Sequence, residues 1–177
     1  MKKQKRNRKY SQLSFFKKIP IEFGGSLLRG KRKSKRPLST KRPIHLTLKS
    51  EKARGIFSFV NHRRSIEELI LKVSKQYGIK IYDKAVNWDH IHFVFKLDSL
   101  KSYQDWIRVL TSEIVSLLAK KTGEKLTDFF THRPHTKILT WGKQFQAALD
   151  YIILNQMEIF GMRPPKKHRR RRKSSSS

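Results

Sequence analysis

The sequence predicts an α+β fold, in which a small antiparallel sheet has helices packed on it. Three observations lead to this prediction. Short segments alternate apolar and polar residues with the two-residue period of a strand, and longer segments repeat apolar residues with helical period. A three-residue turn joins two of the strand-like segments, which is typical of a β-hairpin and therefore of antiparallel pairing.

The first predicted strand covers 44–49 and a second covers 79–86. Residues 87–89 then lead into a third strand that begins at His90. In a strand, residues two apart point to the same face, so His90 and His92 share one face while the apolar residues that alternate with them share the other. One face of this strand is therefore expected to build a core, and the other to present two imidazoles.

Two helices are predicted around these strands. The first covers 65–77, where Ser65 and Glu68 have the spacing of a capping box and Gly78 follows the last apolar residue. The second lies near 100–120, where apolar residues again repeat with helical period. Both helices would lay an apolar stripe on the sheet.

A short edge strand at 136–141 and a last helix complete the pattern. This helix begins after Gly142 and ends at Gly161. Tyr151 and Asn155 lie one turn apart on it and therefore share a face. The last helix is the candidate to cover the polar face of the sheet, and the order of elements fits a ferredoxin-like arrangement.

Positive charge is concentrated at the two ends of the chain. The formal net charge is +29, of which residues 1–50 carry +16 and residues 163–173 carry +8. We therefore divide the chain into a basic N-terminal arm (1–42), a compact domain (43–162) and a basic tail (163–177) that is expected to be disordered without a partner. Charge of this density favours a polyanion, and nucleic acid in particular, as the partner.

The composition also excludes several classes of protein. No apolar run approaches the roughly 20 residues needed to span a bilayer, and neither end forms a sustained amphipathic helix, so we expect no membrane partner. The absence of cysteine rules out disulfides and thiolate metal sites. The basic N-terminus lacks the apolar segment of a secretory signal. We expect a cytoplasmic, nucleoid-associated protein in which nitrogen and oxygen atoms hold any metal.

The residues alone leave alternatives open. His90 and His92 could be ordinary histidines on the solvated face of a strand, and Tyr151 could pack as most helix tyrosines do. The His45-Leu46-Thr47 segment matches one half of the phosphoesterases that use paired His-x-Thr/Ser strands, but a second such motif is absent. The segment 132–135 is interpreted as phosphate-contacting or plain loop, because its proline breaks helical geometry.

Residues beside the two histidines and near the end of the predicted core also admit two interpretations. Asp89 is interpreted as a turn residue rather than a metal ligand. Trp88, Phe129 and Phe130 could stack on nucleic-acid bases, although core packing is expected for at least two of them.

The His90-Ile91-His92 segment follows Asn87, and Tyr151 and Asn155 lie on a C-terminal helix. This combination resembles the single-tyrosine HUH transposases of bacterial insertion sequences. The Tyr-Ile-x-x-Asn form of the helix is most similar to the REP-associated tyrosine transposases. The histidine pair and the tyrosine helix, in this order and spacing, are more specific together than either half.

The resemblance implies a metal-dependent endonuclease and strand transferase that acts on single-stranded or hairpin DNA. Tyr151 would attack a phosphodiester, leaving a covalent 5′-phosphotyrosine link and a free 3′-hydroxyl. A phenol of pKa about 10 is a poor nucleophile at neutral pH, so it needs activation, and the phosphate needs its charge masked. The resemblance assigns this task to a divalent metal, Mg²⁺ or Mn²⁺, held by His90, His92 and Asn155. We expect a monomer with its site built within one chain rather than a homodimer.

The basic arm of about forty residues is longer than in minimal insertion-sequence enzymes. It suggests that the arms grip a bound hairpin or flanking DNA, with strongly salt-dependent binding. It also leaves open whether the protein moves itself or processes repeats elsewhere in a genome. The residues expected to contact DNA are Lys31, Arg32, Lys33, Lys35, Arg36, Arg42, His45, Arg133, Arg169, Arg170, Arg171 and Arg172. The alternative function is a catalytically silent, transposase-derived protein that binds DNA or RNA.

Overall fold

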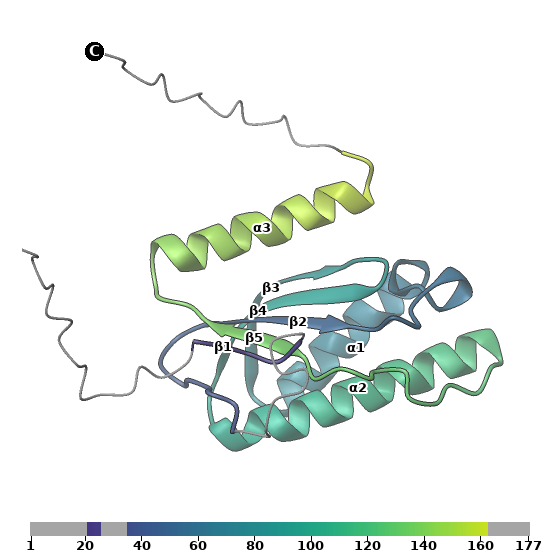
Figure 1. The fold of residues 1–177 in the computed structure, drawn as a ribbon, viewed down its shortest axis with the longest axis horizontal. Coiled ribbons are helices and arrows are strands. Elements are labelled where there is room, and N and C mark those ends of the chain that lie inside the picture. Colours follow the sequence, from purple (N-terminus) through teal and green to yellow (C-terminus); the bar gives the residue numbers. More distant parts are fainter. Residues whose placement is uncertain (1–20, 26–34, 163–177) are drawn as a thin grey trace, which may run out of the picture.

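The computed structural model describes residues 21–25 and 35–162. Its regular elements are a five-stranded sheet, three α-helices and two short 3-10 helices (Figure 1). In chain order they are β1 (Glu22–Phe23), β2 (Ile44–Lys49), η2 (Gly55–Phe57), η3 (Phe59–His62), α1 (Arg63–Gln76), β3 (Ile79–Val86), β4 (His90–Leu97), α2 (Leu100–Thr122), β5 (His135–Ile138) and α3 (Lys143–Ile159). This is the α+β fold that the sequence predicts.

The sheet is antiparallel throughout and has the strand order β1-β5-β2-β4-β3. The predicted hairpin is confirmed, because β3 pairs with β4 across residues 87–89. The prediction that the strand near 136–141 lies at the edge of the sheet is wrong. Residues 22 and 23 pair with β5 on its outer side, so the short strand β1 forms that edge instead.

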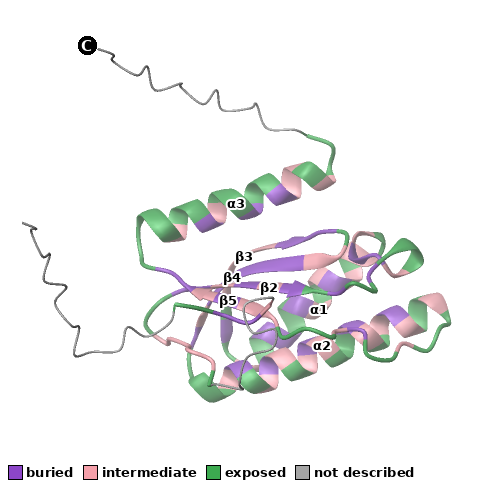
Figure 2. Cartoon of the chain, in the orientation of Figure 1, coloured by how far each residue is buried: buried purple, intermediate pink, exposed green. Residues whose placement is uncertain are grey.

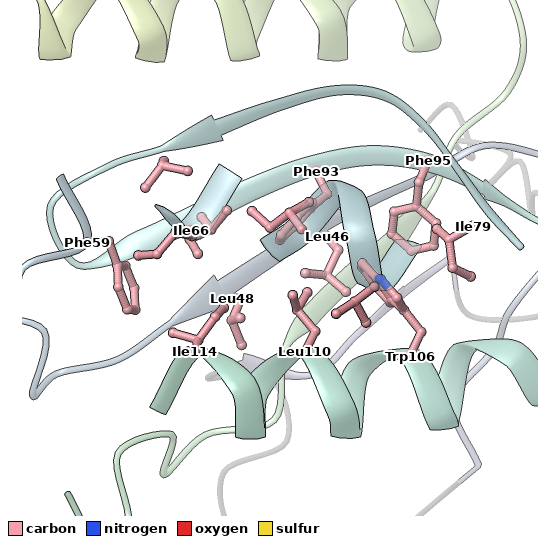
Figure 3. Close-up of a cluster of buried hydrophobic side chains, with 14 of the residues drawn as sticks. Leu46, Leu48, Phe59, Ile66, Ile79, Phe93, Phe95, Trp106, Leu110 and Ile114 are labelled. Carbon is pink, nitrogen blue, oxygen red and sulfur yellow. The ribbon is translucent and has the colours of Figure 1, made fainter. Parts of the chain in front are cut away.

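The main hydrophobic core lies between one face of the sheet and helices α1 and α2 (Figure 3). β4 contributes the apolar set that alternation predicts, and β2 adds a second row beside it. From the helices, Trp106 and Ile70 are among the side chains with no exposed surface. On this face of the sheet the fully buried residues of β2 and β4 are Ile44, Leu46, Leu48, Ile91, Phe93, Phe95 and Leu97. The inward face of each strand was therefore predicted correctly.

Helix α3 covers the opposite face of the sheet, as the element order predicts (Figure 1). Its inner side is buried and its outer side is exposed (Figure 2). Ala148 and Ile152 pack with Ala85, Val94 and Leu139 in a second, smaller cluster. The face that carries the histidines is therefore covered by a helix. His92 is only 4% exposed, so the interpretation that it is an ordinary histidine on a solvated strand face is wrong.

The start of α1 differs from the prediction. The helix begins at Arg63, and its N-cap residue His62 makes no side-chain capping bond. Glu68, which the predicted capping box would direct to the helix end, instead accepts from Arg64 at 3.2 Å. A preceding 3-10 turn supplies the helix entry, so Ser65 lies inside the first turn rather than before it. The end of α2 agrees with the sequence, since Gly123 follows it in a left-handed conformation. α3 ends at Ile159, two residues before the predicted Gly161.

A described part of the predicted arm belongs to the sheet and its surroundings. Gly24 has φ +92 and lies so close to Pro134 O that a Cβ would be 2.1 Å from it, so glycine is required at this position. Arg36 donates to Pro134 O at 2.8 Å and to Thr136 Oγ1 at 2.7 Å. These contacts fasten residues 21–25 and 36 to β5 and to the loop before it.

The residues predicted to contact DNA at the two basic ends lie mostly outside the described residues. Lys31, Arg32 and Lys33 fall in 26–34, and the four arginines 169–172 fall in 163–177. Within the described ranges, no helix is both long and apolar enough to cross a membrane.

Candidate active site

Strand pairing gathers the polar side chains of the sheet under α3. Thr47 lies directly opposite His92 in the β2–β4 register, and His135 lies opposite Thr47 on the other side of β2. Paired residues of an antiparallel sheet point to the same face. His45, two residues before Thr47, therefore shares this face as well. The result is a row of imidazoles and a hydroxyl that the separate strand patterns do not reveal.

His92 is the most enclosed of these imidazoles. Its Nδ1 lies 3.2 Å from His45 Nε2 and 3.2 Å from Thr47 Oγ1. Its Nε2 is buried and has no hydrogen-bond partner among the described residues. Burial lowers the pKa of His92 to about 3 and the pKa of His45 to about 4, because the charged form is poorly solvated there. Both rings are neutral at pH 7, and Nε2 of His92 can offer a lone pair.

His90 is oriented by the turn that precedes it. Asp89 Oδ1 lies 2.6 Å from His90 Nδ1, and Lys49 Nζ lies 3.3 Å from Asp89 Oδ2. Burial acts to raise the pKa of Asp89, but hydrogen bonds from His90 and Lys49 outweigh it and the pKa is lowered. An ionised carboxylate accepts, so Nδ1 of His90 carries the proton. This leaves the lone pair on Nε2, which faces the centre of the site.

Asn87 links the histidine strand to α3. Its Nδ2 lies 2.8 Å from Asn155 Oδ1 and 3.1 Å from His90 Nε2. One amide nitrogen therefore contacts the free acceptor atom of each of these residues. Asn87 is only 5% exposed, and its own Oδ1 has no partner in the described part of the chain. The amide fixes the spacing between β4 and α3 at this point.

Tyr151 lies on the same face of α3, one turn before Asn155. Its ring centroid is 5.1 Å from that of His92 and 6.0 Å from that of His45, and both contacts are edge-on. The side chain of Asn155 donates to Tyr151 O at 2.7 Å, which ties the two residues together. Tyr151 is 46% exposed whereas Asn155 is 7% exposed. The tyrosine therefore stands at the mouth of the site with its ring against the histidines of the same chain.

Contacts at both ends hold α3 in this position. Gly142 precedes the helix with φ 84 and ψ −125, a conformation that favours glycine, and this lets the chain turn from β5 onto the other face of the sheet. Trp141 packs against Tyr82 and Phe145 beside the helix start. Near the other end, Gln156 Nε2 donates to Asp83 Oδ1 at 3.3 Å. The placement of Tyr151 thus depends on β3 as well as on β4.

The donor set at this site fits a divalent metal of the kind the resemblance implies. The buried, unpaired Nε2 of His92 is the observation that tests the fit, because a ligating histidine usually spends its other ring nitrogen on a hydrogen bond, as His92 Nδ1 and His90 Nδ1 do. No group of three or more His, Asp or Glu side chains that could hold a metal occurs within the described ranges. A metal here would need an amide oxygen as a third protein ligand, and Asn155 offers one.

Of the five described residues that were expected to contact DNA, three are exposed and two make contacts within the fold. Lys35, Arg42 and Arg133 are exposed. The guanidinium of Arg36 also lies 4.6 Å from the centroid of the Phe23 ring, so this residue is occupied by contacts within the fold. His45 lies inside the site against His92 rather than on the outer surface.

Residues 39–152 match the family described as transposase IS200 like, which is more than half of the chain. The chain belongs to the IS200-like transposase family. Residues 90, 92 and 151 lie inside the matched range, and Asn155 lies just beyond it.

Solved structures of other transposases are similar to this IS200-like transposase. One is a REP-associated tyrosine transposase bound to a REP hairpin, with 17% identity, a TM-score of 0.55, and coverage of 74% of this chain and 75% of that one. Another is a putative transposase from Deinococcus radiodurans R1, with 16% identity, a TM-score of 0.45, and coverage of 71% of this chain and 98% of that one. No curated protein matches the chain.

Two residues beside the motif have a larger part in the site than the sequence indicated. Asp89 is a turn residue, as predicted, but its carboxylate also orients His90. Asn87 was noted only as part of the motif, and it cross-links His90 to Asn155. The only sign of these roles in the sequence was that Asn87 and Asp89 lie next to the histidine pair.

Phe129 is buried and Phe130 stacks on Phe59, which agrees with core packing for two of the three candidate aromatic residues.

Proposed function

We propose that this IS200-like transposase cleaves and rejoins single-stranded DNA through a covalent link to Tyr151. The observation that carries the proposal is the edge-on contact between Tyr151 and His92 within one chain, beside the Asn87 amide that joins His90 to Asn155. The phenol of Tyr151 is half exposed, so DNA can reach this nucleophile. The neutral rings of His92 and His45 lie beneath it and are largely buried.

In the proposed reaction the phenol oxygen of Tyr151 forms a bond to phosphorus, and the bond from phosphorus to the 3′-oxygen breaks. The phenol loses its proton to solvent, and the departing 3′-oxygen takes up a proton. The downstream strand is then joined to Tyr151 through its 5′-phosphate. Attack by another 3′-hydroxyl on this ester reverses the step, releases Tyr151 and joins two strands. Each step replaces one phosphodiester bond by another, so the proposed reaction needs no nucleotide cofactor to supply energy.

His90, His92 and Asn155 are proposed to hold a divalent metal, Mg²⁺ or Mn²⁺. When bound, such an ion masks phosphate charge and stabilises the leaving oxygen. The chain's own contribution is to keep His92 neutral by burial, to orient His90 through Asp89, and to hold the Asn155 oxygen beside them through Asn87. Asp89 and Thr47 are positioning residues in this scheme, because they act through His90 and His92.

The basic residues outside the site are proposed to bind the DNA backbone. Lys35, Arg42 and Arg133, together with the basic residues of 26–34 and 163–173, would neutralise phosphates of a hairpin and its flanks. A related structure holds a REP hairpin, which supports this class of substrate. Because Tyr151 and the histidines meet within a single chain, we propose that a monomer is sufficient for cleavage.

The proposal is tested with two oligonucleotides of one hairpin sequence, labelled at opposite ends and incubated with the protein and Mn²⁺. A 5′-phosphotyrosine link requires the 3′-labelled strand to appear as an SDS-stable protein adduct. The 5′-labelled strand should instead be released as a shorter fragment that a polymerase can extend from its 3′-hydroxyl. EDTA should abolish both products.

Two tyrosine variants make a matched pair for this assay. Tyr151→Phe removes the nucleophile and should give no adduct, while Tyr77→Phe alters a tyrosine at the end of α1, on the far face of the sheet, and should leave the adduct unchanged. An equal adduct with Tyr151→Phe refutes the assignment. Tight hairpin binding with no adduct in any wild-type reaction would identify a DNA-binding protein without catalytic activity.

A further inference from the structure

The turn between β3 and β4 exposes one aromatic side chain beside the residues of the candidate site. Asn87 and Asp89 both point into the site, through the hydrogen bonds to Asn155 and His90. Trp88, between them, is 59% exposed. The other two tryptophans differ, since Trp106 is fully buried and Trp141 packs against Tyr82 and Phe145. Trp88 is therefore a large apolar surface at the edge of the site that the fold itself does not use.

The backbone that carries this side chain is held on both sides. Trp88 O accepts from Phe59 N at 3.0 Å and from Ser58 Oγ at 3.0 Å. Ser50 N donates to Asp89 O at 2.9 Å, and Asn87 N donates to His90 O at 2.9 Å. The exposed indole thus stands on a fixed support rather than on a loose loop. A fixed aromatic ring stacks on a planar partner with little loss of conformational entropy.

The segment that supports the turn is basic. Residues 49–64 include five Lys and Arg residues and a single acid, Glu51. Lys49 contacts Asp89 directly, and its side chain remains 57% exposed. A partner that suits both features offers a flat aromatic face together with negative charge. A nucleotide in a single strand has both, whereas a base inside a duplex hides its face in the stack.

We propose that Trp88 stacks on the base of an unpaired nucleotide next to the phosphodiester that Tyr151 attacks. The inference rests on the proposed function for the position of that phosphodiester, and it adds a reason why the site takes a single strand. Stacking would hold the strand across the mouth of the site, while the basic segment 49–64 binds the adjoining phosphates. Every base has such a face, so this contact sets strandedness rather than sequence.

Binding is measured in the Tyr151→Phe background, so that no covalent product forms. A fluorescent hairpin with a single-stranded flank is titrated with protein at fixed salt. Replacing a stacking aromatic residue by alanine weakens binding about 10-fold. We expect that loss for Trp88→Ala, a smaller loss for Trp88→Phe, and none for the control Ile153→Ala, an exposed apolar residue on the outer side of α3. Thermal melting of each variant confirms that it is folded.

A scan along the flank locates the contact. 2-Aminopurine placed at successive unpaired positions should be quenched at one position by the protein with Trp88 and not by Trp88→Ala. An abasic nucleotide at that position should weaken binding to the Trp88 protein and leave the Trp88→Ala protein unaffected. Equal affinities of the two proteins for every flank refute the proposal. Tighter, Trp88-dependent binding of the matching RNA would overturn the choice of DNA.

The two proposals can fail separately. Unchanged affinity in Trp88→Ala, together with a normal SDS-stable adduct in the Tyr151 protein, would refute stacking and leave the cleavage reaction intact. Position-specific quenching without any adduct would support stacking and refute cleavage.

Discussion

Replacement of Asp89 tests whether the turn orients a metal-binding histidine. In the structure Asp89 Oδ1 lies 2.6 Å from His90 Nδ1, so the carboxylate keeps the proton on that nitrogen and the lone pair on Nε2. Losing such a partner typically weakens metal binding 10- to 100-fold, or about 1.4 to 2.7 kcal/mol. The Asp89 side chain is 35% exposed and shared with Lys49, so we expect the lower part of that range.

The assay measures Mn²⁺ affinity by calorimetry and the His90 tautomer by nitrogen NMR in the metal-free protein. Asp89→Ala should weaken Mn²⁺ binding about 10-fold and allow both tautomers of His90. Asp89→Asn keeps an acceptor oxygen and should lose less. The control Asp105→Asn lies on α2, where its carboxylate contacts only Arg108 among the described residues, and should bind metal normally. Wild-type affinity and a single unchanged tautomer in Asp89→Ala would refute the role of Asp89.

Three further predictions concern the covering helix, the core and the basic tail. Ile152→Ala, at a fully buried position on the inner side of α3, should lower the free energy of unfolding by about 2 to 3 kcal/mol. The exposed neighbour Ile153→Ala should change it by less than about 0.5 kcal/mol, and urea unfolding measures both. Burial raises the pKa of Tyr103 to about 12, above its unfolded value of about 10. The stability that the neutral phenol contributes is therefore fully present below pH 10 and is lost as the pH rises from about 10 to 12. Tyr103→Phe removes a buried hydroxyl that has no hydrogen-bond partner among the described residues, so it should match or exceed wild-type stability at pH 7 and lose less of it at pH 11. Deletion of 163–177 removes eight Lys and Arg residues and should flatten the plot of log affinity for single-stranded DNA against log salt by up to about 6 in slope.

Each of these three predictions has a result that would contradict it. Equal losses at positions 152 and 153 would mean that α3 does not bury Ile152 in solution. A Tyr103→Phe protein more than about 1 kcal/mol less stable than wild type at pH 7 would mean that the hydroxyl has a partner. An unchanged salt slope after deletion would mean that the tail makes no phosphate contacts.

Alternation and helical period were sufficient for most of the fold because each strand and helix has one clearly apolar face. β2, β3 and β4 follow the predicted boundaries closely, and the two faces of β4 are as expected. Prediction failed where a contact distant in sequence decided the outcome. β1 contains only Glu22 and Phe23, too short a segment to show a period, and it forms only because β5 offers a free edge. The capping box at Ser65 was displaced by the 3-10 turn before α1.

The sequence by itself determined that two histidines share a strand face and that Tyr151 and Asn155 share a helix face, because both facts follow from local backbone geometry. Only the tertiary structure decided that these two faces meet. Strand register sets Thr47 opposite His92, the turn directs Asp89 to His90, and Asn87 spans the gap to Asn155. Burial under α3 then keeps His92 neutral. These relations depend on packing between segments far apart in the chain, which periodicity does not encode.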